Sequence, residues 1–74
     1  MKVYLAYEIQ DWQIRQVSVY SSMQRAIHTC GGKIIQQYGD KYVKSEISKS
    51  YFRVMRYDGD VDDVYYDIVE TEVK

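Results

Sequence analysis

The stretch SYFRVMRYDGDVDDVYYDIVETEV, residues 50–73, carries two runs rich in aromatic and β-branched residues on either side of an acidic segment. Runs of this kind predict two antiparallel strands, residues 50–57 and 63–73, joined by a loop. A two-residue turn at Asp58-Gly59 would pair charged residues with apolar ones and would leave Phe52 outside an aligned apolar face. The closing hairpin therefore needs a longer loop.

Two registers align the apolar faces of these strands. One pairs Phe52 with Ile68 and Val54 with Tyr66 across a loop of five residues. The other pairs Phe52 with Tyr66 across a loop of three residues. Both leave part of the acidic segment at an exposed tip, and both stay open at this point.

The acidic segment YDGDVDD, residues 57–63, places four carboxylates around a single glycine: Asp58, Asp60, Asp62 and Asp63. The alternate spacing of the first three is similar to that of the first three ligands in an EF-hand. The sixth position of that motif must be glycine and is Asp63, and the twelfth should be glutamate and is Val69. We therefore predict a solvated loop that holds no metal.

Apolar and polar residues also alternate near the start of the sequence. Residues 2–9 (KVYLAYEI) and 12–20 (WQIRQVSVY) both show the period of two that is typical of strands. If Val17 and Val19 share the inward face with Val3 and Leu5, Leu5 pairs with Val17 and Val3 with Val19. Residues 10–12 then form the tip of a second hairpin, which places Trp12 near solvent.

A helix is predicted after this hairpin. Ser21 and Gln24 have the spacing of a capping box, and apolar residues recur every three or four positions from Met23 to Tyr38. Gly39 fits a C-cap. The pair at 31–32 disturbs this pattern, because glycine inside a helix costs about 1 kcal/mol. The alternative ends the helix there and makes residues 33–38 (KIIQQY) a strand.

These elements add up to an α+β fold in two layers, with the order ββαββ. A four-stranded antiparallel sheet would carry one helix on one face. The length of 74 residues supports a single domain over residues 1–74. The other sheet face would be open to solvent or to a partner, with Tyr4, Tyr51, Arg53, Met55 and Tyr65 on it.

Composition narrows the possible environments. The net charge of −1 divides into nine Lys/Arg against four acids in residues 1–56, and one lysine against seven acids in residues 57–74. No run of eighteen apolar residues and no secretory signal is visible. The single cysteine, Cys30, cannot form an internal disulfide. We expect a cytoplasmic protein that is a monomer or a weak homodimer.

Few residues of this sequence have side chains that could support catalysis or metal binding. His28 and Cys30 stand two positions apart on the predicted helix and so point to different faces. They cannot form a hydrogen-bonded nucleophilic pair, and a zinc site needs four ligands. The sequence predicts a protein that is not an enzyme and that uses no cofactor.

Two binding functions remain. Basic and aromatic residues that could hold single-stranded nucleic acid are Lys41, Lys44, Lys49, Tyr51, Arg53 and Arg56. A pI of about 5.7 and the acids of the last strand weigh against this function. Binding of a partner protein is the leading expectation, with an exposed tryptophan and acidic loop as anchors: Trp12, Asp58, Asp60, Asp62 and Asp63.

The stretches MKVYLAYEI, SSMQRAI and YFRVMRYDG…DVYYDIVETEV together resemble the small accessory proteins of bacteriophages and prophages. The resemblance covers most of the chain in its layout. It implies stoichiometric binding to a host machine, such as RNA polymerase or a defence nuclease. It assigns no individual functional residue.

Overall fold

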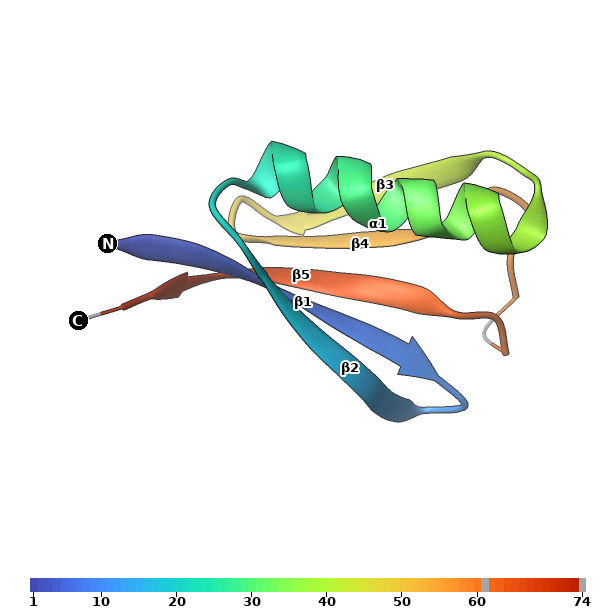
Figure 1. Ribbon diagram of the computed structural model, residues 1–74, viewed down its shortest axis with the longest axis horizontal. Helices are drawn as coiled ribbons and strands as arrows, with labels where there is room; N and C mark the ends of the chain where they lie inside the picture. Colours follow the sequence, from blue (N-terminus) through green and yellow to red (C-terminus); the bar gives the residue numbers. More distant parts are fainter. Residues whose placement is uncertain (61, 74) are drawn as a thin grey trace.

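The structure, a computed structural model, describes residues 1–60 and 62–73. Within these residues the element order is β1 (Lys2–Gln10), β2 (Gln13–Tyr20), α1 (Met23–Tyr38), β3 (Tyr42–Ser48), β4 (Tyr51–Arg56) and β5 (Tyr65–Glu72). The strands form one antiparallel sheet in the order β2-β1-β5-β4-β3, and α1 lies against one of its faces (Figure 1). The predicted α+β architecture is confirmed, but the prediction of four strands is wrong.

The strand that the sequence analysis missed is β3. It lies at an edge of the sheet and pairs only with β4, with Tyr42 opposite Arg56 and Val43 opposite Met55. Its first two residues are half-buried and the other five are exposed. An exposed edge strand needs no alternating apolar side, so its residues show no clear period of two.

Helix α1 runs through both glycines, as predicted, and the alternative strand at residues 33–38 is wrong. The N-cap is Ser22 rather than Ser21, because the Ser22 hydroxyl accepts a hydrogen bond of 3.1 Å from the backbone N–H of Arg25. The predicted capping box is therefore absent. At the other end Gly39 adopts φ 67° and donates to the carbonyl of Ile35, which confirms it as the C-cap.

The core lies between α1 and the sheet. Nine apolar residues are buried among those described: Ala6, Ala26, Ile27, Cys30, Ile34, Val54, Val64, Tyr66 and Ile68. Tyrosines, Met23 and Phe52 surround this set and are partly buried. The apolar stripe predicted for the helix is confirmed by the burial of Ala26, Ile27, Cys30 and Ile34.

The register of β4 and β5 is the first of the two predicted. Phe52 pairs with Ile68, Arg53 with Asp67 and Val54 with Tyr66. The connection runs from residue 57 to residue 64, which is longer than the predicted five residues. Its Val61 lies outside the described residues.

The hairpin of β1 and β2 differs from its prediction. Leu5 pairs with Val19, not with Val17, and Tyr7 pairs with Val17. A bulge after Glu8 shortens the tip to two residues, Asp11 and Trp12. A two-residue turn suits the twist of the strands better than the three-residue tip that we predicted.

The larger correction concerns which face of the sheet the helix covers. Ala6 is buried beneath α1, and Tyr4 packs against the core on the same side. The alternating set that contains Val3, Leu5 and Tyr7 therefore faces away from the helix, although we predicted it to face inward. The prediction that placed Tyr4 on the open side is wrong for the same reason.

We call the side of the sheet away from α1 the open face. Strand pairing places three rows of side chains across it. The rows are Val19, Leu5, Val69 and Tyr51; then Val17, Tyr7, Asp67, Arg53 and Ser45; then Ile14, Ile9, Tyr65, Met55 and Val43. In the described part of the chain the single helix lies on the opposite side (Figure 1), so these rows are covered by no other element.

Candidate partner-binding surface

The tip of the first hairpin presents Trp12 to solvent. Asp11 and Trp12 have φ angles of 54° and 66°, so both lie in the left-handed region. A two-residue hairpin turn requires this conformation, and glycine or asparagine usually supplies it. Trp12 is 75% exposed, as its predicted position near solvent requires. A bulky residue held in this backbone region with its ring in water is unusual, and such strain is common at functional sites.

The acidic loop is held by its own hydrogen bonds. The backbone N–H of Asp60 donates to Oδ2 of Asp63 at 3.0 Å, and the N–H of Asp63 donates to the carbonyl of Asp60 at 3.0 Å. Asp63 also forms an ion pair of 3.7 Å with Arg56, and Asp40 pairs with the same arginine at 3.8 Å. Asp63 therefore has a structural role, whereas Asp58, Asp60 and Asp62 are exposed.

Trp12 and the acidic loop lie at the same end of the sheet. Ile9 pairs with Tyr65, so the tip that follows β1 and the loop that precedes β5 leave the sheet on the same side (Figure 1). The C-terminus of α1 also reaches this end, where the Tyr38 hydroxyl accepts a hydrogen bond of 3.0 Å from the Val64 N–H. We call the set of Trp12, Asp58, Asp60 and Asp62 the end surface.

The basic residues considered for nucleic-acid binding do not form one groove. Tyr51 and Arg53 lie on the open face, while Lys44 and Arg56 lie on the helix side of the sheet. Lys41 precedes β3 and Lys49 follows it, so these two lysines are at opposite ends of that strand. The structure brings Tyr51 and Arg53 together on the open face and places the other four on the helix side or beyond the ends of β3.

The arginines are also neutralised by neighbouring acids. Arg53 Nε donates to Asp67 Oδ1 at 2.8 Å, and its guanidinium lies 4.7 Å from the centre of the Tyr65 ring. The hydrogen bond that Arg53 donates to Asp67 raises the pKa of Arg53 above its ordinary value. Arg53 and Asp67 are opposite each other in the observed register, which pairs Phe52 with Ile68. Little positive charge remains on this face for a phosphate backbone.

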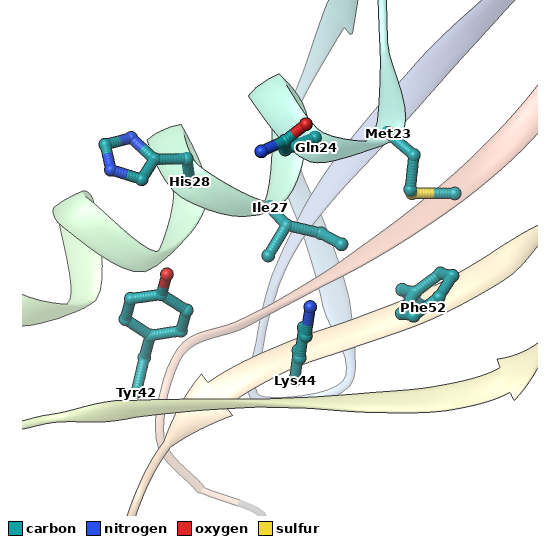
Figure 2. Close-up of a pocket in the computed structure, with 7 residues that line it drawn as sticks. All are labelled: Met23, Gln24, Ile27, His28, Tyr42, Lys44 and Phe52. Carbon is teal, nitrogen blue, oxygen red and sulfur yellow. The ribbon is translucent and has the colours of Figure 1, made fainter.

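A groove of about 660 Å³ lies between the first half of α1 and strands β3 and β4 (Figure 2). Its lining combines apolar, polar and basic side chains: Met23, Gln24, Ile27, His28, Tyr42, Lys44 and Phe52. The Lys44 side chain extends from β3 towards the helix (Figure 2). None of these lining residues is a carboxylate or a cysteine.

The two groups weighed for catalysis or metal binding are kept apart. His28 is exposed at the rim of the groove, whereas Cys30 is fully buried in the core. Burial raises the pKa of the Cys30 thiol to about 11, which keeps it protonated and unreactive at neutral pH. Among residues 1–60 and 62–73 no group of three or more histidine, cysteine or acidic side chains is arranged to hold a metal ion.

One further polar pair lies beside the core. The Tyr66 hydroxyl donates to Glu8 Oε1 at 2.9 Å. Burial raises the pKa of Tyr66 above its ordinary value, and the bond to Glu8 adds to this effect. The pair gives a buried hydroxyl its partner and therefore has a structural role.

Sequence reasoning missed most of the open face. Ile14, Val17 and Val19 are 61%, 48% and 63% exposed, although each has the β-branched side chain that is typical of a core strand. The alternation of residues 2–9 and 12–20 identified the correct set of residues. This alternation could not show which face of the sheet the helix would cover.

Comparison of the chain with protein-family models, with curated proteins and with solved structures found no match. In the part of the chain that the structure describes, no helix has the length and apolar character needed to cross a membrane.

Proposed function

We propose that this protein is a non-catalytic binding module that engages another protein through its end surface. The observation that carries the proposal is the exposed Trp12, held in a left-handed backbone conformation at a two-residue turn. Tryptophan is enriched among the residues that dominate binding energy in protein interfaces. Its exposure has no structural benefit in the free chain.

The acidic loop complements this anchor. Asp58, Asp60 and Asp62 are exposed at the same end of the sheet, and the hydrogen bonds of Asp63 hold the loop in shape. Exposed carboxylates at one end of the sheet favour a partner with a basic surface and increase the rate of association. Proteins that handle nucleic acid have such surfaces.

The partner that we propose is a macromolecular machine of a bacterial host, such as RNA polymerase or a defence nuclease. The support for this step is the resemblance of the sequence to small phage accessory proteins. Binding would be stoichiometric and would modulate or inhibit the partner, in the cytoplasm of the host.

Trp12→Gly is the variant that tests the proposal. Glycine adopts positive φ without strain, so the substitution removes the anchor and should stabilise the free chain by about 1 kcal/mol. The measurement is a pull-down from nuclease-treated bacterial lysate, followed by mass spectrometry. We expect the wild-type chain to retain one large host protein and Trp12→Gly to retain at least ~10-fold less of it.

Ile47→Ala provides a matched control, because Ile47 is an exposed apolar residue near the other end of the sheet, on β3. This variant should retain the partner. The double variant Asp58→Lys/Asp62→Lys should retain less of the partner than the wild type, and this difference should shrink as the salt concentration is raised. Equal capture by wild type and Trp12→Gly would contradict the proposal, as would salt-dependent binding of a labelled single-stranded oligonucleotide with no protein partner.

A further inference from the structure

The open face is too apolar for a surface that only meets water. On β2, β1, β5 and β4, two of its three rows consist entirely of aliphatic and aromatic residues, and its β2 members are about half exposed or more. Monomeric proteins rarely expose contiguous apolar patches of more than a few hundred Å². The middle row adds Val17 and Tyr7 to this patch.

The helix side alone provides a small core. Nine apolar residues are buried among the described residues, and four of them account for the largest fully buried side chains. In chains below roughly 80 residues a single core rarely supplies more than about 3–5 kcal/mol, and oligomerisation is one of the ways to add to it. Cys30 is buried and free, so no internal disulfide adds to this core, and association of two copies would bury further apolar area.

The charge of the three rows on the open face sums to zero. The charged residues of these rows are Arg53 and Asp67, which neutralise each other through an ion pair of 2.8 Å. A strongly basic or acidic partner finds no complementary field there. A second copy of this chain, in contrast, brings the same neutral face and the same pair of opposite charges.

The area of the open face is large enough for a second copy to pack against it. Five strands at ~4.8 Å spacing and about seven residues at ~3.3 Å rise give roughly 500 Å² for each chain. Two copies would therefore bury about 1,000 Å², which reaches the lower range of specific protein interfaces.

From these observations we propose that the open face is the interface of a symmetric homodimer, in which the sheets of two copies pack face to face. The assembly has four layers, with one helix on each outer side. The same patch is used by both copies, as two-fold symmetry requires. The end surface of each copy stays outside the packed sheets.

Charge-reversed variants test this interface directly. Arg53→Asp gives a face with two negative charges, and Asp67→Arg gives a face with two positive charges. The measurement is the molar mass of purified protein by light scattering after size exclusion. We expect the wild type at about twice its monomer mass of 8.8 kDa, each variant alone at the monomer mass, and an equimolar mixture of the two variants restored to the dimer.

A second pair of variants keeps the test decisive if the charge reversals disturb folding, which circular dichroism would show. Val17→Lys/Val19→Lys adds charge to exposed positions of the open face, whereas Ile35→Lys adds it to an exposed position of α1. The first should be monomeric and the second dimeric.

Three results would overturn the inference. One is a wild-type chain that remains monomeric at roughly 1 mM. Another is a dimer that survives Val17→Lys/Val19→Lys. The third is a monomer whose open face binds a different protein. The purified chain suffices for the mass measurements, so their outcome is independent of the end surface and its partner.

Discussion

The two glycines of α1 are neighbours in sequence but have opposite surroundings. A Cβ on Gly31 would overlap the ring of Tyr42, so the absence of a side chain allows the β3 tyrosine to pack against the helix. A Cβ on Gly32 would meet nothing within 4 Å. The sequence indicated the helix through both residues, yet it could not show this contact, because the strand that carries Tyr42 has no clear pattern.

Alanine substitutions should separate the two positions. We expect Gly31→Ala to lower the free energy of unfolding by roughly 1–3 kcal/mol, because the Tyr42 ring must move. Gly32→Ala should raise it by about 1 kcal/mol through better helix propensity. Urea denaturation measures both. Equal effects would show that the Tyr42 contact is not the reason for Gly31.

The Tyr42 contact itself can be checked by a double-mutant cycle. Tyr42→Ala removes the ring that the new methyl group would meet. In that background Gly31→Ala should lose most of its penalty, since the two residues are coupled through this contact. Additive effects would contradict the assignment.

Single elements were predictable where their own residues set the geometry. The sequence reduced the register of β4 and β5 to two possibilities, of which the pairing of Phe52 with Ile68 is the observed one, and Gly39 predicted the end of α1. The side of β1 that the helix covers did not follow, because Ala6 is buried by contacts from distant segments rather than by its own hydrophobicity. The polar edge strand β3 was not predicted, because its exposed residues show no clear period of two.

The N-terminus of α1 gives a test at this scale. Ser22 caps the helix through its hydroxyl, whereas the neighbouring Ser21 is exposed and precedes the cap. We expect Ser22→Ala to lower the free energy of unfolding by about 1 kcal/mol and Ser21→Ala to leave it nearly unchanged. A larger loss for Ser21→Ala, measured by urea denaturation, would restore the capping box.

The molecule as a whole should lose stability in alkali. The pKa of Cys30 rises from 9.0 to about 11 on folding, and that of Tyr66 rises as well, both chiefly through burial. Above pH 9 the unfolded chain releases protons that the folded chain retains, so the free energy of unfolding falls with increasing pH up to about 11. For Cys30 the effect is on the order of 2 kcal/mol.

Urea denaturation between pH 8 and pH 11 measures this loss. Cys30→Ala should make the decrease less steep, although it also lowers stability at pH 8 by leaving a small cavity. An identical slope in wild type and variant would show that the buried thiol does not contribute.

The candidate surfaces also differ in how far sequence could predict them. The exposure of Trp12 and of three loop aspartates followed from their place at two turns. On the open face the positions of Tyr51, Arg53, Met55 and Tyr65 were predicted, but the β1 and β2 members were not, because an apolar alternating set predicts a buried strand whether a helix or a second molecule covers it. Surfaces made from core-like residues are therefore hidden from pattern analysis.

The pairing of β1 with β5 has a kinetic consequence. These central neighbours join Val3 to Thr71 and Leu5 to Val69, so the middle of the sheet is closed by residues from nearly opposite ends of the sequence. Contacts of such long sequence separation slow folding, because the entropy of closing a long loop is lost before the contact forms. A nascent chain that lacks β5 has two separate hairpin-like halves and no joined sheet, so folding must wait for the last strand.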